Sequence, residues 1–102
     1  MRFHSIPIRD ILKEAVHYGG LIVDVRSSEE FLSGHIPMAI NVPIDDIKNG
    51  NYSLPKGKHL LLYCQYGGAS ALASKLLAQE GYQVINTVGG LIQYKGALSS
   101  KK

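Results

Sequence analysis

The sequence predicts an α/β fold, in which an open and mostly parallel β-sheet is flanked by helices on both faces. Short runs such as 21–25 and 59–63 are almost entirely apolar, as in strands that are buried on both faces of a parallel sheet. Segments with helical periodicity separate these runs, and this alternation is typical of parallel sheets. The chain of 102 residues is about the size of one domain, so we expect a single domain over 1–102.

The first half of the chain predicts two strands and three helical segments. The segment 8–16 follows Pro7 and repeats apolar residues at helical spacing, which predicts a helix that ends at Gly19 and Gly20. Its buried face would carry Ile8, Ile11, Leu12, Ala15 and Val16. Ser27 and Glu30 have the spacing of a capping box. The remaining predictions are a strand over 21–25, a helix over 28–32 that ends at Gly34, a strand over 39–42 before Pro43, and a helical turn over 44–49.

The second half of the chain predicts two strands and two helices. A loop rich in glycine, asparagine and proline covers 50–57 and leads into a core strand over 59–63. From residue 69 the composition favours a helix, with a glycine stop at Gly81. A strand over 83–88 and a short helix over 91–98 complete the predicted elements. We expect the tail 99–102 to be frayed.

Composition and charge exclude several classes of function. The longest apolar runs are only a few residues, whereas a membrane-spanning helix takes roughly 20, so we expect no membrane partner. The N-terminal residues lack the apolar core of a secretory signal, which predicts a cytoplasmic protein. A net charge of +3 with scattered basic residues does not indicate nucleic-acid binding. His4, His17 and His59 are dispersed, so we expect no metal and no cofactor. No apolar helix face is left unexplained, which predicts a monomer.

Cys64 is the only cysteine, so it forms neither an internal disulfide nor a thiolate-rich zinc site. One interpretation is a small buried core residue, which is common for unpaired cysteines. However, Cys64 lies where a predicted strand passes through Gly67 and Gly68 into a predicted helix. The free N–H groups and the dipole of a helix N-terminus stabilise anions and favour a thiolate. We therefore favour a reactive thiol in an anion-binding loop.

Four segments of the chain match the pattern of a known family. They are 24–26 (Asp-Val-Arg), 30–42 (Glu-Phe-Leu-Ser-Gly-His-Ile-Pro-Met-Ala-Ile-Asn-Val), 63–70 (Tyr-Cys-Gln-Tyr-Gly-Gly-Ala-Ser) and 88–90 (Val-Gly-Gly). In this order and spacing they resemble the rhodanese-homology domain family, specifically its small single-domain sulfurtransferases. The resemblance covers nearly the whole chain and implies the rhodanese-like fold.

The resemblance also implies a reaction and a set of site residues. Cys64 would take a sulfane sulfur from a small anionic donor such as thiosulfate, become a persulfide, and pass the sulfur to a thiophilic acceptor such as cyanide or a thiol. This is the activity of a thiosulfate:acceptor sulfurtransferase. Because no second cysteine is present to resolve the persulfide, the acceptor must be an outside molecule or partner protein. The substrate-binding residues would be Gln65, Tyr66, Gly67, Gly68, Ala69 and Ser70, and the residues that support the site would be Asp24, Arg26 and Glu30, with Glu30 as a partner of Arg26.

Several positions depart from the family pattern or leave alternatives open. Many members carry arginine where this chain has Ala69, so the loop lacks a cation and predicts weak use of thiosulfate. Related cysteine phosphatases have arginine six positions after the cysteine, where this chain has Ser70, and phosphatase activity is therefore disfavoured. We expect His35 to make structural hydrogen bonds rather than to act as an acid or base. Met38 replaces the usual glycine and predicts a slightly altered turn. A non-catalytic sulfur carrier or regulatory module on the same fold stays open as the alternative function.

Overall fold

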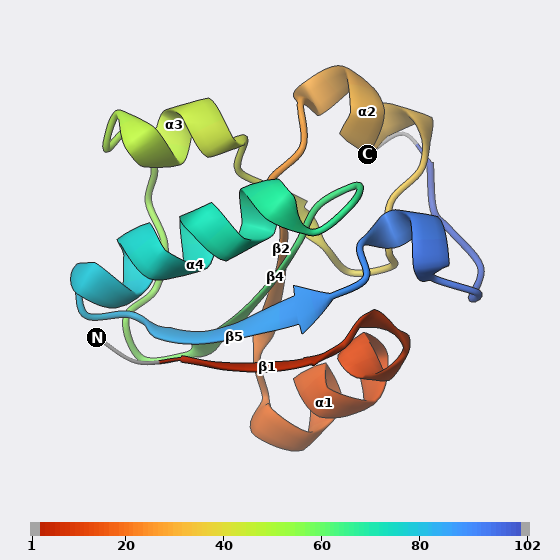
Figure 1. Ribbon diagram of the computed structural model, residues 1–102, viewed down its shortest axis with the longest axis horizontal. Coiled ribbons are helices and arrows are strands. Elements are labelled where there is room, and N and C mark those ends of the chain that lie inside the picture. Colours follow the sequence, from red (N-terminus) through yellow and green to blue (C-terminus); the bar gives the residue numbers. More distant parts are fainter. Residues whose placement is uncertain (1–2, 101–102) are drawn as a thin grey trace.

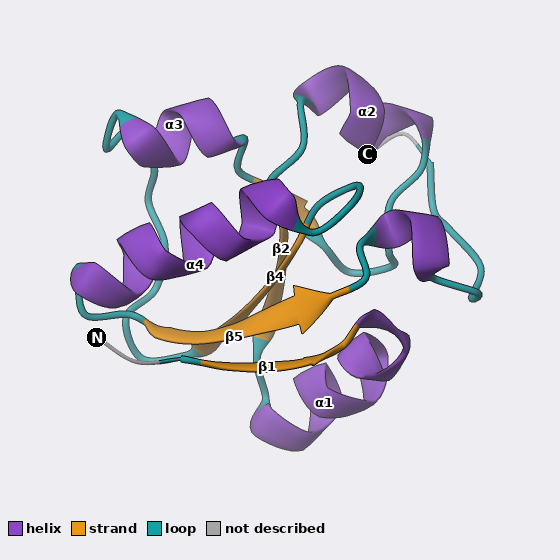
Figure 2. Ribbon diagram, in the orientation of Figure 1, coloured by secondary structure: helices purple, strands orange, loops and turns teal. Residues whose placement is uncertain are grey.

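The computed structural model describes residues 3–100 and contains a five-stranded sheet whose strand order is β1-β5-β4-β2-β3 (Figures 1 and 2). All neighbouring strands are parallel. The strands are β1 (His4–Pro7), β2 (Leu21–Asp24), β3 (Ile40–Asn41), β4 (His59–Tyr63) and β5 (Gln83–Val88). The helices are α1 (Ile11–Tyr18), α2 (Ser28–Ser33), α3 (Ile44–Lys48) and α4 (Gly68–Gln79), with short 3-10 helices η1 (Ile8–Asp10) and η2 (Leu91–Gln93). The predicted α/β fold with a parallel sheet is confirmed.

Helices cover both faces of this sheet, with α3 and α4 on one face and α1 on the other (Figure 1). On the α4 face, Val23, Leu60 and Val84 from three strands pack against Leu77 of α4. The opposite face uses the alternate residues of the same strands, such as Ile22 and Leu61. The inner strands β2 and β4 are therefore buried on both sides, which explains their continuous apolar sequence. No helix within residues 3–100 is long and apolar enough to cross a bilayer.

The sequence prediction missed β1, the edge strand that pairs with β5 in parallel. It is only four residues long, has two exposed residues at its start, and ends at Pro7. Proline is compatible with an edge strand because one side of such a strand needs no N–H donor. The pairing is decided by β5, more than seventy positions further along the chain, and is not visible in the local pattern of residues 4–7.

Three further predictions differ from the structure. The helix expected over 8–16 begins as η1, and Val16 is 77% exposed instead of buried. The helix expected over 91–98 is limited to η2, after which the chain is irregular. The tail expected to fray is held at Ser99, which exchanges two backbone hydrogen bonds of 2.8 Å with His35. The last two residues of the predicted tail, 101–102, lie outside the described residues.

Met38 occupies the turn that was predicted to be altered. Its φ of +73° lies in the left-handed region, where no other non-glycine residue of the described chain is found. A side chain in this region costs about 1–2 kcal/mol relative to the right-handed conformation. The turn therefore keeps a backbone that favours glycine, and methionine bears the strain.

Candidate active site

Cys64 directly follows β4 and lies at the carboxyl edge of the sheet, which is the edge where all five strands end. Its side chain belongs to the apolar cluster beneath α4, and the residue is 3% exposed. The short loop 64–67 then leads into α4, whose first residue is Gly68. The arrangement of strand, glycine turn and helix N-terminus matches the setting predicted from the sequence.

The Sγ atom of Cys64 accepts two backbone N–H groups, from Gly67 at 3.0 Å and from Ser70 at 3.2 Å. Both donors belong to the start of α4, where N–H groups have no partner within the helix. Gly67 adopts a φ of +112°, so a residue without a Cβ is required there, whereas Gly68 has no such requirement. The hydroxyl of Ser70 donates to the carbonyl of Gly67 at 3.3 Å and closes the turn. The two N–H groups direct their positive partial charges toward the sulfur, an arrangement that suits an anion there.

A pocket of about 370 Å³ opens onto Cys64 at the carboxyl edge. The predicted residues Gln65, Tyr66, Gly68 and Ala69 line it together with Cys64. Gly67 and Ser70 do not line the pocket, but their N–H groups donate to the sulfur of Cys64. The remaining lining residues come from the loop between β2 and α2, from α2 and from the start of α3, and are Val25, Arg26, Ser27, Glu30 and Ile44. Tyr66 is 74% exposed at the mouth. Val25 and Ile44 were not predicted as site residues, because an apolar residue beside a strand or helix end carries no signal of its own.

Asp24 and Arg26 form a buried ion pair next to this pocket. Nε and Nη2 of Arg26 donate to the two carboxylate oxygens of Asp24, with a shortest distance of 2.7 Å. Nη2 also donates to the Gly34 carbonyl at 2.6 Å, and Nη1 donates to Oε1 of Gln65 at 3.3 Å. Burial acts to lower the pKa of Arg26, but the hydrogen bond and charge of Asp24 outweigh it, so the pKa is raised. Arg26 is therefore permanently charged and ties three loops together.

Glu30 does not form the expected ion pair with Arg26. Within residues 3–100, Asp24 is the acidic partner of Arg26. Oε1 of Glu30 instead accepts the backbone N–H of Ser27 at 3.2 Å, and the Ser27 hydroxyl accepts the N–H of Glu30 at 3.2 Å. This reciprocal pair is the capping box predicted from the spacing. Asp24 ends β2, only two residues before Arg26, and its carboxylate bonds the guanidinium directly. The Glu30 carboxylate is instead held by the backbone N–H of Ser27.

Tyr63, the last residue of β4, supports the site through a hydrogen bond that the sequence did not predict. Its side chain is fully buried, and its hydroxyl oxygen accepts the N–H of Ile36 at 3.0 Å. Burial, with a further contribution from Asp24, raises the pKa of Tyr63 well above its ordinary value. The phenol therefore stays neutral and connects the residue before Cys64 to the turn that contains His35.

The opposite side of the Cys64 loop rests on the turn that follows β5. The N–H of Leu91 donates to the Cys64 carbonyl at 2.8 Å, and the N–H of Ile92 donates to the Gln65 carbonyl at 3.1 Å. Gly90 approaches the loop so closely that a Cβ there would lie 2.4 Å from the Gln65 carbonyl oxygen. The Gly89-Gly90 pair was visible in the sequence as a turn, but only the tertiary structure shows that it supports the loop.

The histidines have structural surroundings. His35 is buried, its Nδ1 lies 2.8 Å from the Phe31 carbonyl oxygen, and its ring stacks on Phe31 at 3.8 Å. His4, His17 and His59, which are dispersed in the sequence, all gather around Tyr18, with ring centroids 4.7–6.4 Å from that of Tyr18. No group of three or more metal-binding side chains is found within residues 3–100.

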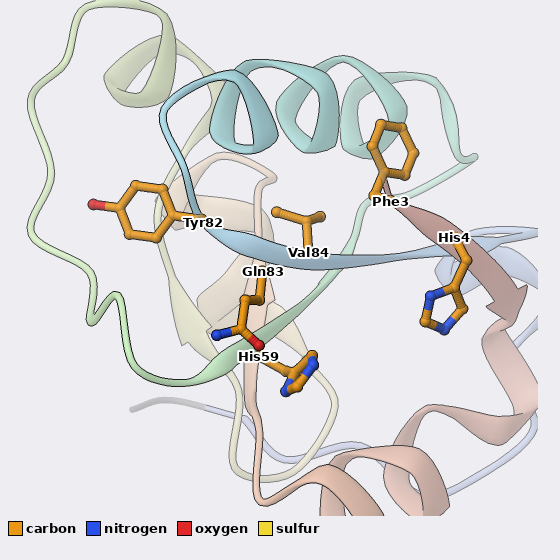
Figure 3. A pocket seen from close by; sticks show the side chains of 6 residues that line it. All are labelled: Phe3, His4, His59, Tyr82, Gln83 and Val84. Carbon is orange, nitrogen blue, oxygen red and sulfur yellow. The ribbon is translucent and has the colours of Figure 1, made fainter. Parts of the chain in front are cut away.

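A second cavity of about 490 Å³ lies at the amino edge of the sheet, where the strands begin. Figure 3 shows its lining: Phe3 and Tyr82 lie on one side of β5, and His4, Gln83 and His59 lie on the other. Since Cys64 and its N–H donors are at the other edge, this cavity is separate from the candidate active site.

The chain is similar to proteins named as sulfurtransferases. It is 31% identical over 80 residues to the putative sulfurtransferase YtwF of Bacillus subtilis, covering 78% of each chain. It is 36% identical over 75 residues to a sulfurtransferase of Allochromatium vinosum, covering 72% of this chain and 70% of the relative. It is 35% identical over 82 residues to a tRNA sulfurtransferase of Desulfurococcus amylolyticus, covering 80% of this chain but only 16% of that longer protein.

Solved structures and a family model agree with these similarities. The structure of a rhodanese-like domain protein from Staphylococcus aureus superposes with a TM-score of 0.81 at 29% identity, covering 99% of this chain and 100% of that one. Other relatives have the names adenylyltransferase and sulfurtransferase, and putative sulfur carrier protein. The model of the rhodanese-like domain matches residues 9–97. This match spans most of the chain, and the protein therefore belongs to the rhodanese-like domain family.

Proposed function

We propose that this protein is a sulfurtransferase that carries sulfane sulfur on Cys64. The observation that supports the proposal best is the position of Sγ, which accepts N–H groups from Gly67 and Ser70 and faces an open pocket. Backbone donors that are already oriented stabilise an anion without reorganisation. The same donors serve the thiolate before the reaction and the persulfide after it.

The proposed reaction has two steps. In the first, the Cys64 thiolate attacks the outer sulfur of a sulfane donor such as thiosulfate; a new S–S bond forms, and sulfite leaves with the electron pair of the broken bond. In the second, a thiophilic acceptor such as cyanide or a thiolate attacks the outer sulfur of the persulfide, and the electron pair returns to Cys64. Covalent catalysis of this kind splits one transfer into two easier steps and gives ping-pong kinetics.

The acceptor in this scheme is a second molecule, because the sequence contains one cysteine. Relatives of this chain are named as sulfur carriers or as parts of adenylyltransferase and sulfurtransferase proteins, which supports a partner protein as one acceptor. A reducing compartment such as the cytoplasm would keep Cys64 free to react between cycles.

The second candidate function is a sulfur carrier that stores a persulfide but does not turn over with small molecules. The engagement of Arg26 by Asp24 favours this alternative, because within residues 3–100 it leaves the pocket lining without a cation that is free to bind thiosulfate. The two functions share the persulfide and differ in whether small molecules such as thiosulfate and cyanide support turnover.

The test is intact mass spectrometry after incubation with thiosulfate or with inorganic polysulfide. We expect the native protein to gain one sulfur atom, cyanide to remove it as thiocyanate, and Cys64→Ser to gain nothing while keeping its unfolding midpoint. A native protein that gains no sulfur from either donor contradicts the proposal. A protein that loads sulfur but releases it to cyanide or small thiols no faster than free polysulfide does supports the carrier instead.

A further inference from the structure

Two charged side chains line the Cys64 pocket, and they are Arg26 and Glu30. Asp24 balances the charge of Arg26 through a bidentate ion pair, and two further N–H groups of the guanidinium donate to the Gly34 carbonyl and to the Gln65 side chain. Four of the five guanidinium N–H groups are thus engaged, which leaves Arg26 with one N–H group of Nη1 for a substrate. Among the described residues that line the pocket, Glu30 is the charged side chain without an ion pair.

Glu30 is exposed and lines the pocket, and its carboxylate forms no salt bridge within residues 3–100. It accepts neutral donors, the N–H and the hydroxyl of Ser27, which orient the carboxylate without neutralising it. Further carboxylates lie in the first turns of the two short helices beside the pocket, at Glu29 in α2 and at Asp45 and Asp46 in α3. The α2–α3 side of the mouth is therefore acidic.

Two other cations at this edge of the sheet, Arg9 and Lys95, line a different cavity. That cavity has a volume of about 370 Å³ and is also lined by Val88 and Ile92. Neither cation lines the Cys64 pocket. Among the described residues that line the pocket, a dianion that approaches Cys64 therefore meets a carboxylate and no cation without an ion pair, whereas a cation meets a complementary charge.

We infer that the Cys64 pocket selects aminothiols, that is, thiols with a protonated amine a few bonds from the sulfur, as sulfur acceptors over anionic thiols. This inference rests on the proposed function. The apolar side chains of Val25, Ile44 and Ala69 line the same pocket as Glu30 and Cys64, and they suit a short alkyl chain. The aminothiolate sulfur attacks the outer sulfur of the Cys64 persulfide, a new S–S bond forms, the bond to Cys64 breaks, and its electron pair restores the thiolate.

The experiment compares three acceptors of similar size and different charge on protein that has been loaded with polysulfide. The acceptors are cysteamine, 2-mercaptoethanol and 3-mercaptopropionate, and the readout is the rate at which intact mass loses one sulfur. The variant is Glu30→Gln, because glutamine keeps the capping bond and removes the charge. For each thiol, the rate with Glu30→Gln is divided by the rate with the native protein, so the intrinsic reactivity of the thiol cancels.

We expect Glu30→Gln to slow cysteamine about fivefold and to accelerate 3-mercaptopropionate about fivefold, as for one unit charge at short range in water. The rate with 2-mercaptoethanol should not change. Added salt should reduce both effects, since screening weakens interactions between exposed charges. Glu29→Gln is the matched comparison, because Glu29 is in the same helical turn but does not line the pocket. As one of the carboxylates beside the mouth, it should change the rates in the same directions but by less than about twofold.

Equal changes for all three thiols would overturn the inference and assign Glu30 a purely structural role. Unchanged rates would also overturn it, while the sulfur gained on loading would still support the proposed function. Failure of the native protein to load any sulfur would instead contradict the proposed function itself.

Discussion

The cavity at the amino edge of the sheet is larger than the Cys64 pocket at the carboxyl edge, about 490 Å³ against about 370 Å³, yet Cys64, the proposed reactive group, is at the carboxyl edge. The amino-edge cavity is lined by two imidazoles, an amide and two aromatic rings, which come from the starts of strands (Figure 3). The carboxyl-edge pocket contains a thiol whose sulfur already accepts two backbone N–H groups.

The difference between the edges follows from the direction of the chain. At the carboxyl edge a strand passes into the start of a helix, where free N–H groups and the positive end of the dipole meet. At the amino edge a helix ends before a strand, and that end is closed by its own bonds, as where Gly20 donates to the Ala15 carbonyl at 2.8 Å. Ligands of open α/β sheets bind at the carboxyl ends of strands for the same reason. The size of a cavity is therefore a poorer guide to chemistry than the polarity of the backbone around it.

The ion pair beneath the pocket gives the largest expected effect on stability. Asp24→Asn leaves the buried Arg26 without its charge partner, which should lower the free energy of unfolding by about 3–5 kcal/mol. Chemical denaturation at pH 7 measures this value. Asp45→Asn, an exposed change on α3, is the control and should stay within about 0.5 kcal/mol. A small loss for Asp24→Asn would show that the carboxyl edge does not depend on this pair.

Two glycines with positive φ, one at each edge, separate backbone strain from support of the site. Gly90→Ala places a Cβ 2.4 Å from the Gln65 carbonyl oxygen at a φ of +67°, whereas Gly19→Ala at +60° meets nothing within 4 Å. We expect Gly90→Ala to lower the free energy of unfolding by about 2–4 kcal/mol and to slow the loading of sulfur on Cys64. We expect Gly19→Ala to lower the free energy of unfolding by about 1 kcal/mol and to leave sulfur loading unchanged. Thermal unfolding and loading rates measure both. Equal losses in both variants would mean that the contact with the Cys64 loop is unimportant.

The hydroxyl of Tyr63 gives a smaller effect that depends on pH. Tyr63→Phe leaves the Ile36 N–H without an acceptor, so the free energy of unfolding of the variant should be about 1–3 kcal/mol lower than that of the native protein at pH 7. Because the folded state raises the pKa of Tyr63, it holds the phenolic proton more tightly than the unfolded chain does. This contribution to stability is present below about pH 10 and is lost as the pH rises further.

Unfolding curves between neutral and strongly alkaline pH test this dependence. The native protein should lose stability above about pH 10 more steeply than Tyr63→Phe does. Parallel curves for the two proteins would contradict a buried, neutral phenol.

Substitutions at the amino edge should have the smallest effects. His59→Gln removes a ring whose centroid lies 4.7 Å from that of Tyr18, and His4→Gln removes one at 6.4 Å. We expect each to change the free energy of unfolding by about 1 kcal/mol or less and to leave sulfur loading of Cys64 unchanged. Loading that falls with either substitution would show that the two edges communicate, and would weaken the distinction drawn above.

Much of the fold was visible in the sequence because the responsible signals are local. The strands β4 and β5 have the predicted bounds, and the capping box at Ser27 and Glu30 is present with both of its bonds. These features depend on residues within a few positions of one another. By contrast, β1 was missed, because its partner is a distant strand.

The candidate site shows the same division between local and distant signals. The loop after β4 could be predicted from Cys64, Gly67 and the helix that follows, since a turn and a helix start are properties of consecutive residues. The surroundings of this loop could not be predicted from the sequence. Ile44 lines the pocket, and the N–H of Ile36 donates to the Tyr63 hydroxyl, only because segments that are far apart in the chain meet in space. The choice of Asp24 over Glu30 as the partner of Arg26 likewise required the geometry of side chains.

The sequence by itself thus determined the parallel α/β architecture and the place of Cys64 at the start of a helix, because strand burial, glycine turns and helix caps are encoded by neighbouring residues. Only the tertiary structure decided which charges face the sulfur. The buried carboxylate of Asp24 pairs with Arg26, while Glu30 is exposed to solvent and forms no salt bridge within residues 3–100. Desolvation of this kind depends on contacts between segments far apart in the chain, and these contacts give the Cys64 pocket its charge.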